Sequence, residues 1–307
     1  MNTSKAYGHE LTGKGYIIEN DLIIGFSIIG LCIFQLIFAT VNLWILKKVD
    51  IFHNSFGFLV AARTISEMFS SFIHLGYSGP MTVLQLPDTP PVLGLIVGYF
   101  GYGFATMACF LHVVLSINRF IAVYLPLQYG RMFSIRNCAC LLIVDFIVIV
   151  VIVTPIYLVP CNLVGYSAQH YGYVILGCRD EHEHRLFQYS TFTNWACWVS
   201  FCTGAIAVDS LTLIKIIKMK RVQSVKRDKH FTRNVRFFAQ SAFQNIPMFA
   251  DVALLILGNN QITEDKALFR IVSFTLTRIT DLINSMDRAR DRVFITHNYN
   301  YSLRRHS

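Results

Sequence analysis

The sequence predicts an all-α fold, a seven-transmembrane helix bundle, on three observations. Only 15% of the 307 residues are charged, whereas a soluble domain carries about 25%. The charged residues gather in short stretches between long apolar runs, as in proteins that cross a membrane several times. Lysine and arginine are concentrated in alternate loops, which gives the bundle an orientation.

Seven stretches are predicted to cross the membrane within one domain, residues 22–290. The first contains 25 residues without a charge, enough for roughly 37 Å of helix. The second is bent or ended near Gly79 and Pro80, because proline cannot donate a backbone hydrogen bond. The predicted spans are about residues 22–46, 56–86, 93–117, 138–159, 187–214, 237–257 and 268–290.

The seventh span is weakly supported. Arg270 and Arg278 break its apolar run, which then gives way to charged residues from Asp287 to Arg292. A centred arginine costs about 2.5–3.5 kcal/mol on the insertion scale. This helix can therefore insert only if neighbouring helices shield its charged side chains.

The distribution of positive charge places the N-terminus on the outer side of the membrane. One set of loops and ends carries sixteen lysines and arginines, and the alternate set carries five. The basic set is expected in the cytoplasm, so residues 1–21 are extracellular and residues 291–307 form a cytoplasmic tail. This arrangement requires an odd number of crossings, which favours the seventh span. The basic set comprises residues 47–55, 118–137 and 215–236, with Arg304 and Arg305.

The net charge of +9 does not indicate nucleic-acid binding, because the basic residues lie in short loops beside a membrane rather than on a soluble face. Nine of them lie in residues 215–236, a segment that is expected to attract anionic lipid or a cytoplasmic partner. Asn2 begins an Asn-Thr-Ser sequon on the expected outer side, where it could be glycosylated.

Two of the eight cysteines fall in the outer loop between the fourth and fifth spans. The exterior is oxidising, so Cys161 and Cys178 are expected to form a disulfide. That bond would close a loop of about 17 residues and contribute about 3 kcal/mol. The other six cysteines lie inside predicted spans, where they act as small apolar packing residues.

Several ionisable residues fall inside the spans. Arg63 and Glu67 are four residues apart and share one helix face, so they form a structural polar cluster, a switch or an ion site. Asp145 and Asp209 lie within two turns of the cytoplasmic boundary and are expected to have local structural roles. Asp251 lies in the outer half of the sixth span, where it is the best candidate to contact a ligand.

No pairing of a nucleophile with a base, no phosphate-binding loop and no HExxH helix occurs in the sequence. The sequence therefore predicts a protein that is not an enzyme, with no cofactor and no metal.

The end of the third span carries a family resemblance. Its residues Ser116 to Val123 contain Asn118-Arg119-Phe120, which resembles the Asp-Arg-Tyr region of rhodopsin-like G-protein-coupled receptors with Asn in place of the acid. The whole pattern looks more specifically like the nematode serpentine receptors of class X, from about residue 23 to 260. That pattern includes Asn54-Ser55-Phe56-Gly57, Pro80-Met81-Thr82, Phe133-Ser134 and Phe237 to Ser241 with Gln244.

The resemblance implies a chemosensory receptor that binds a small molecule and signals through a heterotrimeric G protein, in the cilium of a sensory neuron. Arg119, with Asn118 beside it, would face the G protein. Gly94 stands about where rhodopsin-like receptors place a cysteine, so an internal bridge between Cys161 and Cys178 would replace the usual one. Gly101 occupies the level of the aspartate of amine receptors, which argues against an amine ligand of that type.

Two alternatives to a signalling receptor stay open. A transporter or channel would cross the membrane in a similar way, but such folds usually contain repeats, and none is visible here. A divergent receptor-like chain that does not signal is the other, because the seventh span is charged around Asp287.

Overall fold

A computed structural model of the chain describes residues 11–48, 53–158, 163–176 and 181–222. The predicted sixth and seventh spans, residues 237–257 and 268–290, lie outside the described residues. The described part is helical apart from one small hairpin and short connecting segments.

The first half of the described chain forms two long antiparallel rods. Helix α1 covers Glu19–Lys48. The second rod consists of α2 (Ser55–Ile73), the π-helical turn η3 (His74–Ser78) and α3 (Gly79–Leu84). Asn54 caps the start of α2, because its side chain accepts a hydrogen bond from the Gly57 backbone at 2.9 Å. The span was expected to bend or end near Pro80. This proline comes just after the π-helical turn, and the chain continues as helix from there to Leu84.

The second half adds a long central helix and two further rods. Helix α4 covers Pro91–Tyr124 and has proline in its first turn, where no backbone donor is needed. A short helix α5 (Pro126–Met132) leads into α6 (Ile135–Leu158). The strands β1 (Val164–Ser167) and β2 (Gly172–Ile175) pair antiparallel, with Val164 opposite Ile175. Helix α7 covers Glu181–Val222.

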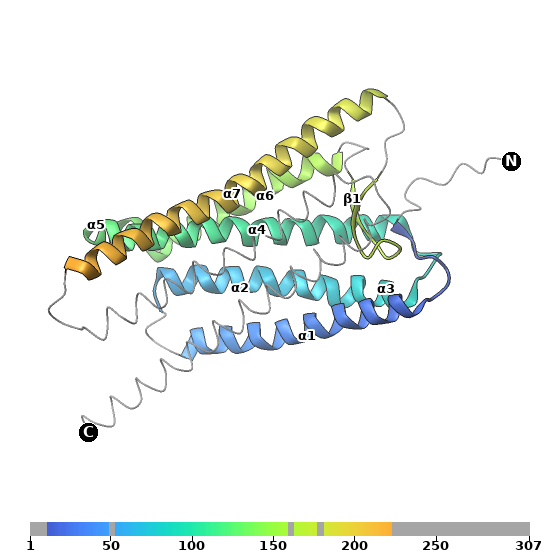
Figure 1. Cartoon of the computed structure of the whole chain (residues 1–307), viewed down its shortest axis with the longest axis horizontal. Coiled ribbons are helices and arrows are strands. Elements are labelled where there is room, and N and C mark those ends of the chain that lie inside the picture. Colours follow the sequence, from blue (N-terminus) through green and yellow to red (C-terminus); the bar gives the residue numbers. More distant parts are fainter. Residues whose placement is uncertain (1–10, 49–52, 159–162, 177–180, 223–307) are drawn as a thin grey trace, which may run out of the picture.

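The rods lie side by side along the long axis of the molecule, as Figure 1 shows. Helix α4 is central and contacts α2, α6, α7 and β1, while α1 packs against α2 and α3. The hairpin lies across one end of the bundle, which we name the hairpin end, and the short helix α5 lies at the opposite end, the α5 end.

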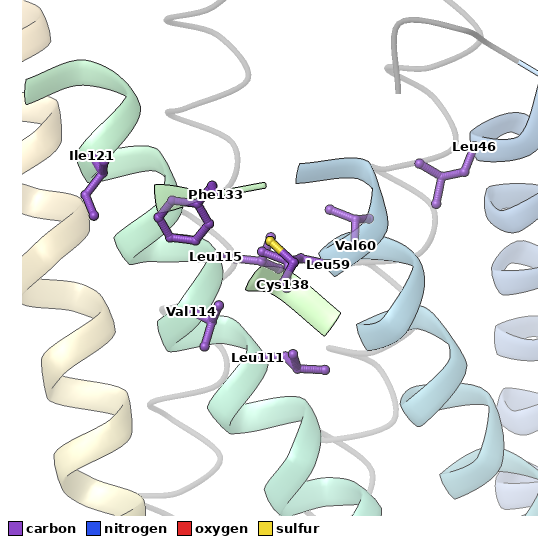
Figure 2. Close-up of a cluster of buried hydrophobic side chains, with 9 residues drawn as sticks. All are labelled: Leu46, Leu59, Val60, Leu111, Val114, Leu115, Ile121, Phe133 and Cys138. Carbon is purple, nitrogen blue, oxygen red and sulfur yellow. The ribbon is translucent and has the colours of Figure 1, made fainter. Parts of the chain in front are cut away.

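The largest group of buried apolar side chains lies toward the α5 end, where α1, α2, α4, α5 and α6 meet (Figure 2). Leu59 and Cys138 at its centre have no exposed surface. The cluster is made of Leu46, Leu59, Val60, Leu111, Val114, Leu115, Ile121, Phe133 and Cys138.

The outward faces of the helices are apolar. Phe26, Trp44 and Phe146 are each about three-fifths exposed, at 60%, 58% and 61%. Four of the described helical segments are long and apolar enough to cross a membrane, and a fifth qualifies if α5 and α6, bent by 63°, count as one span. Exposed apolar surface on this scale suits a lipid environment rather than water.

Candidate functional site

An arginine and an aspartate from two different helices meet toward the α5 end. One Nη of Arg119 on α4 donates to both carboxylate oxygens of Asp209 on α7, at 2.8 and 3.1 Å. The hydroxyl of Ser116 accepts from the same nitrogen at 3.0 Å. The side chain of Arg119 is 11% exposed and that of Asp209 is 2% exposed. Charges buried this deeply are costly unless they are paired, so this contact is one of those that hold α7 against α4.

A second polar contact docks α5 beside this ion pair. The hydroxyl of Tyr129 donates to the Asn118 amide oxygen at 3.4 Å and lies 3.3 Å from the hydroxyl of Ser55 at the start of α2. On the same short helix, Leu127 is 98% exposed. An apolar side chain with almost no contact of its own is available to a partner at this end.

Arg63 and Glu67 lie in contact inside the second rod. The Arg63 Nε donates to a carboxylate oxygen of Glu67 at 2.9 Å, and the two side chains are 4% and 3% exposed. The hydroxyl of Ser71 donates to the backbone carbonyl of Glu67 at 3.0 Å. The i, i+4 spacing brings the two charges together on one buried face of α2.

Gln85 is the centre of a polar cluster at the hairpin end. It has no exposed surface, and its amide nitrogen donates to Asp21 on α1, to the Thr82 carbonyl and to the Ala168 carbonyl of the hairpin turn, at 3.0, 3.1 and 3.1 Å. The Lys14 backbone donates to its amide oxygen at 3.2 Å. One side chain thus joins α1, α3, the hairpin and the segment before α1.

The same cluster contains a lysine and a tyrosine that share Asp21. The Lys14 ammonium donates to Asp21 and to the Tyr171 hydroxyl, each at 3.0 Å, and Tyr171 also donates to Asp21. Burial opposes the charge on Lys14, but these hydrogen bonds outweigh burial and raise its pKa. Burial and the bond to Asp21 also raise the pKa of Tyr171. Both shifts favour the protonated forms that the cluster contains.

Two tyrosines of the hairpin, Tyr166 and Tyr173, contact residues of the second rod. The hydroxyl of Tyr166, a residue with no exposed surface, lies 2.6 Å from the Thr82 hydroxyl. The hydroxyl of Tyr173 lies 3.4 Å from Nε2 of His74, and the two rings meet edge to face. A side chain at Gly101 would come within 2.4 Å of that hydroxyl. Tyr173 therefore fills the space that glycine leaves on α4.

Comparison with known protein families identifies the family of this helix bundle. A family model described as the serpentine-type seven-transmembrane G-protein-coupled chemoreceptor Srx matches residues 24–287. The chain belongs to this Srx family. A comparison with individual curated proteins gives no significant match.

Membership in the Srx family confirms the predicted fold class and resemblance. The Srx receptor is a seven-transmembrane protein of a non-enzymatic receptor family, in agreement with the sequence prediction. The match reaches residue 287, beyond the resemblance recognised up to about residue 260. It therefore includes the predicted sixth span and nearly all of the charged seventh.

The structure locates some of the predicted site residues of this Srx receptor and not others. Arg119 and Asn118 lie at the α5 end, and Arg63 and Glu67 lie within the second rod. Asp145 on α6, which was expected to have only a local structural role, has no exposed surface, and neither carboxylate oxygen has a partner among the described residues. The other predicted site residues lie outside the described residues: Asp251, Cys161, Cys178 and Asn2.

Sequence reasoning missed three features of the site. It gave Asp209 only a local structural role, although the amide at Asn118 leaves Arg119 without an acid beside it and Asp209 lies near the same boundary. It also treated the segment after the fourth span only as an outer loop and did not anticipate a hairpin there. Gln85 gave no signal at all, because an isolated glutamine after a helix is normally solvated. Among the described residues, no group of three or more His, Cys, Asp or Glu could hold a metal ion.

Proposed function

We propose that this Srx receptor detects a small-molecule ligand toward the hairpin end and activates a heterotrimeric G protein at the α5 end. Family membership supports a chemoreceptor of the G-protein-coupled class. The observation that carries the proposal is the buried Arg119, which is held between two helices at the end of the bundle that also carries basic residues. A ligand that binds one arrangement of the helices more tightly shifts the population toward it.

The proposed orientation places the α5 end in the cytoplasm. Lys47 and Lys48 end α1 there, and Arg131 and Arg136 lie on α5 and at the start of α6. Basic residues favour the cytoplasmic side, so the hairpin end and residues 1–21 would be extracellular in a multi-pass plasma membrane protein. A sensory cilium is the location that the family resemblance suggests.

The apolar side chain of Leu127 supports a docking role for this end. It is 98% exposed on α5, at the same end of the bundle as Arg119. In the proposed orientation α5 lies beyond the membrane, so lipid would not cover this side chain. An exposed apolar side chain that becomes buried against a partner contributes to binding through the hydrophobic effect. The G protein would then contact α5 and reach Arg119 when α7 moves.

The proposed ligand site lies among the outer halves of the helices. Asp251, in the predicted outer half of the sixth span, is the candidate ligand contact, and Tyr173 and His74 supply polar groups on the described side. A disulfide between Cys161 and Cys178 would constrain the chain on both sides of the hairpin, and Asn2 would carry a glycan.

The test reconstitutes the full-length receptor in lipid vesicles with purified heterotrimeric G proteins. Fractions of secreted small molecules are added as probes, and the rate of nucleotide exchange on the G protein is measured. The expected result is that at least one fraction accelerates exchange, and that Arg119→Ala abolishes the response. Arg136→Ala removes a positive charge from an exposed position at the same end and should respond normally. Ion flux through receptor-only vesicles, without any exchange activity, would instead favour a transporter or channel.

A further inference from the structure

The chain before α1 is bound to the hairpin end instead of extending into solvent. Residues 11–15 lie beside the hairpin, at the dark blue start of the described chain in Figure 1. Leu11 is only 1% exposed, although it precedes the first residue of α1 by eight positions. Segments near a chain end are usually poorly ordered unless other contacts hold them. The contacts of residues 11–15 therefore indicate a specific docking site.

The side chain of Leu11 is enclosed between the hairpin and α4. A Cβ placed at Gly165 on β1 would lie 2.6 Å from both methyl carbons of Leu11. A Cβ at Gly94, near the start of α4, would lie 3.4 Å from the Leu11 Cβ. The missing side chain of Gly165 thus leaves the space that Leu11 fills. The other apolar side chains of this cluster are Leu95, Leu163, Val174 and Leu176.

The backbone of residues 11–15 is held by the segment that follows α3. The Gly13 nitrogen donates to the Leu86 carbonyl at 2.8 Å, and the Gly15 nitrogen donates to the Gln85 carbonyl at 2.9 Å. A Cβ at Gly13 would lie 2.1 Å from the carbonyl carbon of Gln85, so only glycine permits this approach. Backbone hydrogen bonds together with an enclosed side chain are the features of peptide recognition.

Lys14 joins the same segment to α1 and to the hairpin. Its ammonium donates to Asp21 and to the Tyr171 hydroxyl, each at 3.0 Å. The Gln169 amide donates to the Gly13 carbonyl at 3.4 Å. Residues 11–15 therefore contact four elements at the hairpin end. Five residues of this region have no exposed surface: Asp21, Gln85, Tyr166, Ser167 and Ala168.

We propose that residues 11–15 are a built-in peptide whose docking closes the hairpin end between α1 and the hairpin. The site recognises one enclosed leucine, one glycine backbone and one lysine, and its occupant is this segment of the same chain. While the segment is docked, water and small molecules do not pass between α1 and the hairpin. Release of the segment opens this passage without unfolding the helices. This closure goes beyond the proposed function and does not require a G protein.

Cys32 on α1 reports the closure, because it belongs to one buried cluster with Tyr166 of the hairpin and has no exposed surface. The experiment measures how fast a small water-soluble methanethiosulfonate labels each cysteine of the full-length receptor, by mass spectrometry of its peptides. Gly13→Ala should raise the labelling rate of Cys32 by at least about tenfold, which corresponds to about 1.4 kcal/mol of lost docking free energy. Cys138, which is equally buried toward the α5 end, should keep its parental rate.

Gly30→Ala is the matched control for this variant. It adds the same methyl group on α1, where a Cβ would have no atom within 4 Å, and should leave the labelling of Cys32 unchanged. A parental labelling rate of Cys32 in Gly13→Ala would overturn the proposal. Faster labelling of both Cys32 and Cys138 would also contradict it, because the receptor would then unfold globally instead of releasing one segment.

A pair of compensating substitutions tests the enclosed leucine. Gly165→Ala places a methyl group where the Leu11 methyl carbons lie, so it should speed the labelling of Cys32. Leu11→Ala removes the obstructing atoms, so the double variant should be labelled more slowly than Gly165→Ala alone. If the increase in the double variant equals the product of the two single increases, the residues do not meet and the docking site is wrong.

Hydrogen–deuterium exchange of the parent receptor tests the docking without any substitution, and so applies even where Gly13→Ala does not fold. Residues 12–15 should be protected to a similar degree as the hairpin residues 163–176, despite their position near the chain end. Exchange of residues 12–15 at the rate of a free peptide would overturn the proposal. Neither measurement involves a G protein, so a receptor that fails to activate one would contradict the proposed function and leave this inference standing.

Discussion

The hairpin packs closely against the bundle at Gly98 on α4. A Cβ placed there would lie 2.1 Å from the Val164 carbonyl oxygen and 3.0 Å from Cα of Gly165. Ordinary contacts between such atoms are about 3.4 Å or longer, so Gly98→Ala requires β1 to retreat by about 1.3 Å. Both obstructing atoms belong to the backbone and cannot rotate away.

The hairpin is held on its other side and cannot retreat freely. Tyr166 contacts Thr82 at 2.6 Å, and the Ala168 carbonyl accepts from Gln85 at 3.1 Å. Overpacking of a tight contact costs about 1–3 kcal/mol, and one lost buried hydrogen bond adds about 1 kcal/mol. We therefore expect Gly98→Ala to destabilise the receptor by about 2–4 kcal/mol.

Two glycines on the same helix serve as controls. A Cβ added at Gly103 would have no atom within 4 Å, so Gly103→Ala should be neutral or stabilising by up to about 1 kcal/mol, because alanine favours helix. At Gly101 the obstacle is the hydroxyl end of Tyr173, at 2.4 Å, which a side-chain rotation can move. Gly101→Ala should therefore fall between the other two variants.

Thermal unfolding of the purified receptor in detergent measures this series. A thiol-reactive dye reports unfolding, because Cys32, Cys138 and Cys202 are fully buried in the folded state. Gly98→Ala should melt at a clearly lower temperature than Gly103→Ala. Equal melting temperatures for these two variants would refute the close packing of β1 on α4.

Three further predictions concern charged and apolar side chains. Because the pKa of Lys14 is raised in the folded protein above its usual 10.5, its contribution to stability is present below that pH and lost as pH rises through the folded pKa. The parent should therefore lose more thermal stability above about pH 10.5 than Lys14→Met. Arg63→Gln and Glu67→Gln should each destabilise by about 3–5 kcal/mol, and the double variant by much less than their sum, in a double-mutant cycle of thermal unfolding. Leu127→Ala should weaken G-protein activation at unchanged thermal stability, whereas Ile143→Ala, at an exposed apolar position on α6, should leave activation unchanged.

Each of these predictions has an outcome that contradicts it. Equal alkaline sensitivity of the parent and Lys14→Met would show that the lysine is not held as described. Additive effects of Arg63→Gln and Glu67→Gln would mean that the two charges do not interact. A drop in melting temperature for Leu127→Ala would place that side chain in the fold rather than at a docking surface.

The sequence predicted the helices well because their signal is local. Each apolar run is long enough to be read as a span without knowledge of its neighbours, and the described helices overlap the first five predicted spans. The contact between Arg63 and Glu67 also follows from helix geometry, since residues four apart share a face. Hydropathy alone did not decide whether the seventh span crosses the membrane. The match to a seven-transmembrane family supports seven crossings.

The contacts between elements could not be predicted in this way. Helices in a membrane are apolar on most faces, so the pattern of residues does not reveal which face of α7 meets α4. The pairing of Asp209 with Arg119 depends on that rotation, and so does the position of Tyr173 over Gly101. The contacts of Gln85 depend in addition on its left-handed backbone conformation, with φ of 45° at the end of α3. A glutamine in the sequence does not predict that conformation.

The distribution of polar bonds indicates where this receptor can move. Among the described residues, α1, α3, the hairpin and the segment before α1 share one network around Gln85 and Asp21, so a displacement of any one breaks bonds to several others. Between α4 and α7, the polar contacts of the described residues gather at the α5 end around the pair of Arg119 and Asp209, while farther along the two helices meet through apolar and aromatic side chains such as Phe110 and Phe201. A ligand shifts an arrangement of helices by its differential affinity alone, so a displacement that breaks one polar contact needs less from the ligand than one that breaks several at once. The movement that carries a signal should therefore occur in α7, while α1, α3 and the hairpin stay fixed.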